Sequence, residues 1–440
     1  MKNSDSHDNQ FLEETNDVQH SGAVRWVRKI TDAFPAFQSR NYKLYFFGQL
    51  VSLIGTWLQI VAQGWLILQL TDSVFLIGLV TALSTVPTLL FTLFGGLVVD
   101  RFSKRKILFY TQSLAMSLAF LLGVFTLTGL VTVWLIGLMA FLLGMVMAID
   151  APARQAFVAE LVNKTQLSSA IALNSGIFNA ARVIGPGIAG LLIGMIGIGG
   201  AFIVNGLSFI GVLIALKALR LKDPLFDQKP IGALKAISEG IAYAYRHPVI
   251  SMFLGLAGIV SVFGWSFTTV IPLLAKNKFQ MDATGLGYLY SSIGLGSLSA
   301  AVLVGAFLGK IKPVLYITGG CCIFSIGIIL FTFTKDSGLA MILLFFSGFG
   351  LLSQAATINT TIQSMVRPEF RGRVMSLYVL MFLGMTPIGN LQVGWVSERV
   401  GVESALRLGA VIVCLMGILL LLFRPRILKA YQAYVKAGEG

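Results

Sequence analysis

Residues 96–106 read Gly96-Leu-Val-Val-Asp100-Arg101-Phe-Ser-Lys104-Arg105-Lys106, an acidic-then-basic turn between two long apolar stretches. The flanking stretches are residues 74–99 and 107–129. Each can cross a bilayer as a helix, since a hydrocarbon core of about 30 Å needs roughly 20 apolar residues. The turn therefore marks a place where the chain leaves a membrane and enters it again.

The same alternation continues along the chain and gives twelve apolar stretches in two sets of six. The expected spans are 44–69, 74–99, 107–129, 131–150, 166–194 and 198–219, then 250–275, 285–308, 313–334, 338–363, 372–397 and 403–423. Only 12% of the residues are charged, against about 25% in soluble domains. Because the bilayer interior offers no hydrogen bonds to the backbone, each span is expected to be a helix. The expected fold class is all-α integral membrane, with twelve transmembrane helices in two pseudo-symmetric six-helix bundles.

This division predicts five regions along the chain. They are a cytoplasmic N-terminal tail at 1–40, an N-terminal six-helix bundle at 41–219, a cytoplasmic central linker at 220–249, a C-terminal six-helix bundle at 250–423 and a cytoplasmic C-terminal tail at 424–440. Many secondary transporters are built from two six-helix halves, with the substrate site between the halves.

The net charge is +14, and the basic residues are unequally distributed between the two sides of the membrane. Of the 33 Lys and Arg residues, 27 fall in tails and loops on the side of the N-terminus, five fall on the other side, and Arg182 lies inside a span. This asymmetry follows the positive-inside rule, so both termini are expected in the cytoplasm. Topology and contact with anionic lipids account for the basic charge, and no nucleic-acid partner is expected.

The turn at 96–106 resembles the signature loop of the major facilitator superfamily, G-x-L-a-D-r-x-G-r-k. The matching residues are Gly96, Asp100, Arg101, Lys104 and Arg105. Ser103 replaces the second glycine and Val98 the leucine. The corresponding loop of the second half, Gly305-Ala-Phe-Leu-Gly309-Lys310-Ile-Lys312, keeps the first glycine and the basic charge but lacks the acid. A degraded copy at the matching place indicates duplication.

In that family the loop locks one end of the two bundles, so the resemblance implies a gating role for these residues. Asp100 is then expected to face the N-terminus of the eleventh helix near Arg373, where the helix dipole favours a carboxylate. Asp150 ends the fourth span on the same side, and Arg101 or Arg105 is expected to pair with it.

The fifth span resembles the antiporter motif of proton-coupled efflux members of the superfamily. It reads Ala181-Arg182-Val-Ile-Gly185-Pro186-Gly187-Ile-Ala189-Gly190, and the matches are Gly185, Pro186 and Gly190. Small residues let helices approach closely and a proline permits a bend, so plain helix packing is the alternative interpretation. The resemblance implies export driven by protons, and the rim acids Asp150 and Glu160 are the candidate proton carriers.

Two further stretches look like the enterobactin-exporter and macrolide-efflux branch of the superfamily. They are Asp150-Ala-Pro-Ala-Arg-Gln-Ala-Phe-Val-Ala-Glu160 and Arg371-Gly-Arg373-Val-Met-Ser-Leu-Tyr378. The resemblance covers roughly residues 40–423. It implies a monomeric transporter, not an enzyme, in the bacterial cytoplasmic (inner) membrane, with a siderophore, a macrolide or another amphiphile as its small-molecule substrate.

Polar side chains follow one face of the first span at intervals of 3, 4, 3 and 4 residues, which places them on one side of a helix. They are Gln49, Ser52, Thr56, Gln59 and Gln63. Amides that face lipid are costly, so this face is expected to line a wet cavity or a seam between helices. The tenth span has a comparable face in Gln354, Thr357 and Thr361.

Arg182 lies about 16 residues into its span, roughly 24 Å deep at a rise of 1.5 Å per residue. No expected span holds an acid at that depth. An intramembrane charge is a functional hypothesis by default. Its acceptors are Asn179, backbone carbonyls or an anionic cargo, so a structural role and a substrate contact both stay open.

Aromatic and methionine side chains in the spans suit a bulky amphiphile, although ordinary packing is their commoner role. They include Phe46, Trp57, Trp65, Met139, Met145, Trp265, Met381 and Met385. The sequence has no His, Cys or carboxylate cluster with metal-ligand spacing and no Walker-type phosphate loop. No metal, cofactor or ATPase is therefore expected.

Other functions stay open beside siderophore export. The chain can be a multidrug or macrolide efflux pump, a lipid or metabolite importer of the same fold, or a membrane sensor or scaffold that transports nothing. A membrane enzyme is disfavoured, because the sequence shows no cluster of catalytic His and Asp residues or nucleophiles near one interface.

Overall fold

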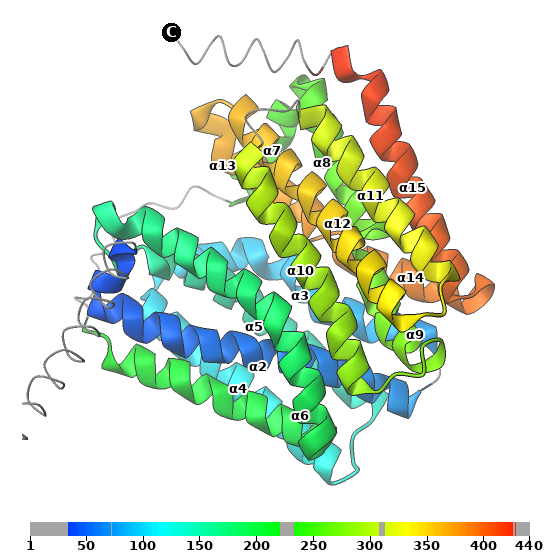
Figure 1. Ribbon diagram of the computed structural model, residues 1–440. Coiled ribbons are helices and arrows are strands. Elements are labelled where there is room, and N and C mark those ends of the chain that lie inside the picture. The colour runs from blue at the N-terminus through cyan, green and yellow to red at the C-terminus, as the bar shows by residue number, and fades with distance from the viewer. Residues whose placement is uncertain (1–33, 72, 221–232, 308–312, 426, 428–440) are drawn as a thin grey trace, which may run out of the picture.

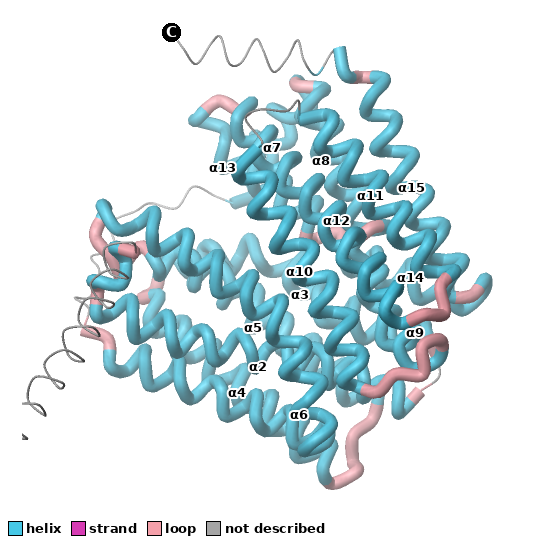
Figure 2. The backbone as a smooth tube through the Cα atoms, in the orientation of Figure 1, coloured by secondary structure: helices cyan, strands magenta, loops and turns pink. Residues whose placement is uncertain are grey.

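The computed structural model describes residues 34–71, 73–220, 233–307, 313–425 and 427 (Figures 1 and 2). Over these ranges the chain is helical, with short 3-10 segments and no strand. The tails expected at 1–40 and 424–440 lie largely outside the described residues, as do residues 308–312 of the second-half loop.

The N-terminal bundle is built from four helices and a long helical hairpin. Its elements are η1 (Pro35–Gln38), α2 (Arg40–Leu70), α3 (Val74–Arg101), α4 (Lys104–Leu127), α5 (Val133–Val158), η2 (Lys164–Gln166) and α6 (Leu167–Ala218). Ser73 and Thr132 cap α3 and α5, because each side chain accepts a hydrogen bond from the backbone N–H three residues on. Such caps satisfy donors that the first helical turn leaves free.

The hairpin α6 holds two crossings in one element. Its 52 residues would extend for about 78 Å if straight, more than twice the thickness of a bilayer core. Gly197 breaks it with a φ of 72°, a conformation that glycine adopts without steric cost. The chain reverses there (Figure 1). Both arms pack on α2, since Gly185 lies against Trp57 and Gly48 lies against Gly211.

The C-terminal half begins with a helix inside the central linker and continues with six crossings. Its elements are α7 (Ala233–Arg246), α8 (Pro248–Phe263), η3 (Trp265–Val270), α9 (Ile271–Asn277), α10 (Ala283–Phe307), α11 (Pro313–Phe333), α12 (Ser337–Met365), α13 (Pro368–Phe382), α14 (Thr386–Val400) and α15 (Val402–Leu422). In the described part of the chain, eleven segments are long and apolar enough to cross a membrane. One of them is the hairpin at Lys164–Ala218, which counts twice and brings the crossings to twelve.

Two expected spans of the second half are broken near their middle. The stretch 250–275 changes from α8 to the 3-10 helix η3 at Gly264 and continues as α9. The stretch 372–397 is divided between two helices: α13 ends at Phe382, and α14 begins at Thr386 with Pro387 in its first turn. A proline at this position cannot continue the preceding helix.

The linker helix α7 is attached to the C-terminal bundle. Tyr243 stacks on Phe370 of α13 with ring centroids 4.6 Å apart, and Glu239 forms a 2.7 Å ion pair with Arg373. Part of the segment expected to be a linker is therefore an ordered helix with a packed face.

The twelve crossings form two six-helix bundles that meet at one end and diverge toward the other (Figure 1). We call the diverging end the basic end; it holds α7 and the loops at 101–104, 158–167 and 365–368. The opposite end holds the turn at Gly197 and the loops at 70–74, 127–133, 277–283, 333–337 and 400–402. The bundles meet where α6 packs on α10 and where α3 packs on α14.

Hydrogen bonds between the bundles lie toward the opposite end. Lys276 of α9 donates to the carbonyl of Leu68 at 3.1 Å, and Thr284 of α10 donates to the carbonyl of Gly190 at 3.3 Å. The structure is thus closed at the opposite end, and its bundles are spread at the basic end.

Candidate functional site

A cavity of about 610 Å³ lies between the two bundles. It is lined from the N-terminal bundle by α2, α3, α5 and both arms of α6, and from the C-terminal bundle by η3, α9, α10 and the break between α13 and α14. Its polar and aromatic lining includes Thr56, Trp57, Gln59, Gln63, Thr81, Ser84, Phe178, Arg182, Asn205, Phe209, Trp265, Thr268, Thr269, Tyr290, Phe382 and Thr386. A volume of this size holds a drug-sized molecule.

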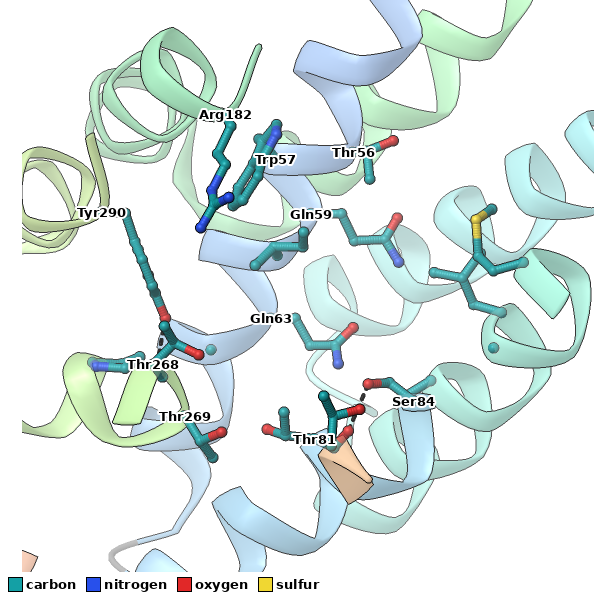
Figure 3. Close-up of a pocket in the computed structure, with 18 of the residues that line it drawn as sticks. Thr56, Trp57, Gln59, Gln63, Thr81, Ser84, Arg182, Thr268, Thr269 and Tyr290 are labelled. Atoms are coloured by element: carbon teal, nitrogen blue, oxygen red, sulfur yellow. Dashed lines mark hydrogen bonds between the residues drawn. The ribbon is translucent and has the colours of Figure 1, made fainter. Parts of the chain in front are cut away.

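Three of the five polar residues predicted on the first span line this cavity: Thr56, Gln59 and Gln63 (Figure 3). Gln59 is held by Asn205 of α6, whose amide donates to the Gln59 oxygen. Thr56 donates to the carbonyl of Ser52 at 3.0 Å. The Gln63 side chain lies between Gln59 and Thr81 (Figure 3).

The other two, Gln49 and Ser52, do not line the cavity. Both side chains are buried toward the basic end of α2, and Ser52 lies 3.5 Å from the amide oxygen of Gln112 in α4. Ser52 therefore lies in a seam between helices, which is the other environment that the sequence predicts for this polar face.

Four further residues predicted for the cavity, Asn179, Gln354, Thr357 and Thr361, also lie away from it. Asn179 donates to the carbonyl of Ser175 one turn earlier in α6. On α12 the side chains of Gln354, Thr357 and Thr361 are buried and bond to backbone carbonyls of their own helix. Part of this face packs on α11, because Gly320 lies against Gln354.

The C-terminal bundle contributes polar residues that sequence reasoning did not single out. Tyr290 of α10 donates to the carbonyl of Thr268 at 3.0 Å (Figure 3). Thr269 donates to the side-chain oxygen of Asn390 at 2.9 Å. Thr386 begins α14 at the cavity wall. Most of these residues lie near the points where the spans are broken. The prolines and glycines near the breaks are the sequence signal that could have predicted them.

Arg182 is the one charged residue among the described residues that line the cavity. Its guanidinium carbon lies 5.0 Å from the ring centroid of Trp265, which belongs to the other bundle. Its side chain projects into the cavity beside Trp57 (Figure 3). Within the described ranges it has neither a carboxylate partner nor a hydrogen-bond acceptor.

The segment of α6 that resembles the antiporter motif, Gly185–Gly190, forms a contact between the bundles. Gly190 lies against the backbone of Ala283, where a Cβ would come within 2.6 Å of the carbonyl oxygen. The carbonyl of Pro186 lies against Gly287, and Gly185 makes room for Trp57. Small residues at these positions allow α6 to approach both α10 and α2.

Asp150 is fully buried at the basic end, but its charge partner is not the one expected from the sequence. It pairs with Arg154 one turn later and accepts hydrogen bonds from Thr111 at 2.7 Å and Gln112 at 2.8 Å. Arg105 instead donates to the carbonyls of Leu216 and Lys217.

That pairing expectation was therefore wrong, and Arg101 is exposed at the end of α3. The physical reason is proximity. An arginine one helical turn away on α5 reaches the buried carboxylate more directly than one that must cross from α4.

The other predicted gating and coupling residues also lie at this end. Lys104 forms a 2.6 Å ion pair with Glu160, and Arg373 is engaged by Glu239 of α7. Gly96 and Asp100 fall within α3, but their surroundings lie outside what the structure describes. The approach of Asp100 to the eleventh helix stays a prediction.

The chain matches the family model described as "Transmembrane secretion effector" over residues 31–437. It is 24% identical over 368 residues to the staphyloferrin A transporter of Staphylococcus aureus, covering 82% of this chain and 90% of that protein. It is 24% identical over 387 residues to macrolide efflux protein A of Streptococcus pyogenes, covering 85% and 95%. With an enterobactin exporter of Escherichia coli the identity is 24% over 392 residues, covering 87% and 91%.

Solved structures share the fold at low sequence identity. An inward-facing, unoccupied bacterial homologue of the human lysosomal transporter Spinster superposes with a TM-score of 0.68 at 14% identity, covering 90% of this chain and 97% of that one. A peptide transporter in complex with sulfate gives a TM-score of 0.72 at 12% identity, covering 89% and 96%. The chain is a multi-pass membrane transporter of small molecules that belongs to the major facilitator superfamily, in the family of transmembrane secretion effectors.

Proposed function

We propose that this transporter is a monomeric secondary exporter that moves a siderophore or another amphiphilic small molecule out of a bacterial cell by alternating access. The observation that carries the proposal is the cavity between the bundles, whose lining is mainly apolar and aromatic with a few polar groups. Such a lining suits a molecule with both apolar and polar parts. The names of the relatives, which include siderophore and macrolide exporters, support the same cargo class.

Orientation follows from the charge asymmetry. The basic end carries the loops rich in Lys and Arg, so we place it and both termini in the cytoplasm of the inner membrane. With the bundles spread at that end, this conformation receives cargo from the cytoplasm. Closure of the basic end and opening of the opposite end then release it outside.

We further propose that protons drive export. The support is the resemblance of the Gly185–Gly190 segment to the antiporter motif, together with two acids at the basic end, Asp150 and Glu160. Each acid is paired with a basic side chain, Arg154 or Lys104. Loss of such a pair on protonation would release a contact at the end of the bundle that has to close.

The proposal is tested by efflux from cells and by transport in liposomes. A deletion strain that expresses the chain should export members of a panel of siderophores and macrolides, and inverted vesicles should accumulate the same compounds. In liposomes with a clamped membrane potential, an imposed pH gradient should drive the movement. Uptake into intact cells would show an importer, and indifference to the pH gradient would exclude proton coupling.

The two candidate proton carriers can be separated in the same liposomes. The variant that lacks the carrier, Asp150→Asn or Glu160→Gln, should lose transport driven by the pH gradient yet still exchange labelled for unlabelled cargo at equilibrium. A folded variant that keeps its response to the gradient excludes that acid as the carrier.

A further inference from the structure

The cavity holds two hydrogen-bond donors that lack acceptors, and they lie next to each other on different bundles. One is the guanidinium of Arg182 on α6. The other is the indole N–H of Trp265 on η3, a buried atom with no hydrogen-bond partner. A buried donor without an acceptor is destabilising, and the half-buried guanidinium faces a cavity in which the described residues provide it with no anion.

Their separation is short enough for one small acidic group to reach both. The guanidinium carbon lies 5.0 Å from the centroid of the Trp265 ring. A carboxylate has two oxygens and accepts several hydrogen bonds, and it matches the planar donor fork of arginine. An apolar ring lies beside the indole, since Phe382 meets Trp265 edge-on with centroids 5.6 Å apart.

Two other polar groups of the lining already have partners. The Tyr290 hydroxyl donates to Thr268, and the amide of Asn205 donates to Gln59. No acid lines the described cavity, so the protein itself supplies no counterion to Arg182. The charge that completes this site has to arrive with the cargo.

We propose that Arg182 and Trp265 form a two-donor site for a carboxylate or ionised phenolate on an amphiphilic cargo. The inference rests on the proposed function and narrows its cargo to anions. Because α6 and η3 belong to different bundles, the bound anion joins the bundles at the level of the cavity. The aromatic surfaces of Trp57, Phe178 and Phe382 are left to hold the apolar part of the molecule.

The test compares two fluorescent probes of nearly equal shape on the purified full chain in detergent. Dansylglycine carries a carboxylate, and dansylglycinamide carries a neutral amide at the same place. Fluorescence anisotropy with direct excitation of the dansyl group gives both dissociation constants. Wild-type protein should bind the acid at least about tenfold more tightly than the amide, since a hydrogen bond to a charged group is worth about one order of magnitude or more.

Trp265→Phe is the informative variant, because it keeps an aromatic face for the guanidinium and removes only the N–H. It should lower the preference for the acid about tenfold and leave binding of the amide unchanged. Arg182→Gln should abolish the preference. Trp134→Phe is the matched control, since Trp134 is exposed and lies outside the cavity, so its replacement should leave the preference unchanged.

Equal affinity of the wild type for both probes, or an undiminished preference for the acid in Trp265→Phe, would contradict the proposed two-donor site. Binding of the neutral amide and the melting temperature show whether each variant is folded. The probes report on binding without transport, so this outcome is independent of the export assay. A protein that exports but shows no preference refutes the site alone, and one that shows the preference but exports nothing refutes the proposed function alone.

Discussion

Ser73, the N-cap of α3, donates a hydrogen bond of 2.8 Å to the carboxylate of Glu398 in α14, across the seam between the bundles. One side chain thus starts a helix of the first bundle and binds a helix of the second. Nearby, Gly78 lies against the backbone of Asn390 and Gly394. This seam closes the opposite end of the molecule.

Ser73→Ala should weaken the closure of that end. A lost hydrogen bond to a charged group costs about 1.5–3 kcal/mol, and less in this exposed contact. We therefore expect a shift of a few-fold in the population toward the conformation open at the opposite end. Distances between spin labels on α3 and α14 measure this shift. An unchanged distance distribution would show that Ser73 does not hold the seam.

Gly78→Val should prevent the seam from closing at all. A Cβ at this position would lie 2.5 Å from the carbonyl oxygen of Asn390 and 3.1 Å from the Cα of Gly394, both of which are backbone atoms. We expect normal insertion and near-complete loss of transport in an efflux assay. Gly319→Val is the matched control, because nothing lies within 4 Å of a Cβ there. Transport by the Gly78 variant at the wild-type rate would contradict the close packing of α3 on α14.

Asp150→Asn should destabilise the N-terminal bundle, because it leaves the charge of Arg154 without its partner. Breaking a buried ion pair by removing one member costs about 3–5 kcal/mol. The double variant Asp150→Asn/Arg154→Gln removes both charges and should recover a large part of that loss. The melting temperature in detergent gives the comparison. A double variant no more stable than the single one would show that the pairing is not the main contribution of Asp150.

Asp100→Asn should impair transport while expression and insertion stay normal. The family resemblance assigns this carboxylate to the closing of the basic end, where it would meet the positive end of α13 near Arg373. The asparagine keeps the shape and removes the charge. Initial rates of efflux at matched protein levels test this, with Ser103→Gly as a variant expected to be mild. Full activity of Asp100→Asn would exclude a role for the Asp100 charge in closing the basic end.

Both termini should lie in the cytoplasm. The prediction rests on 27 of 33 basic residues falling on the side of the N-terminus. A reporter enzyme that is active only in the periplasm, fused after residue 440, should remain silent. The same reporter inserted at the loop 127–133 should be active. The reverse pattern would show that both termini lie outside the cytoplasm. This conformation would then be open to the outside of the cell.

Most of the fold follows from runs of about 20 apolar residues, because a bilayer admits few alternatives to a spanning helix. Local features were harder to predict. The helix α7 is too short and too polar to register as a span, and it is held by the contacts of Tyr243 and Glu239 with α13. The helix breaks at Gly264 and after Phe382 lie next to η3 and α14, which pack on each other. Hydropathy does not report such contacts.

The cavity was predictable only in part, because periodicity gives a face but not what the face meets. On α2 the polar face divides, because Thr56, Gln59 and Gln63 line the cavity. Gln49 and Ser52 are buried outside it, and Ser52 contacts Gln112 of α4. Depth along the helix decides between these two environments. The partner of Arg182 was not predictable, since Trp265 lies on the other bundle. Contacts of that kind depend on how the two bundles dock.

The turn at Gly197 has a consequence for biogenesis. Its flanks, Ile196 and Ile198, are apolar, and the hairpin from Leu167 to Leu216 contains a single charged residue, Arg182. A helical pair of this kind can leave the translocation machinery as one unit, because no ionised loop has to be carried across the bilayer. Lys164 and Lys217 remain at the starting side as anchors. Insertion of Asp or Lys beside Gly197 should therefore delay assembly of the first half before it alters any step of the transport cycle.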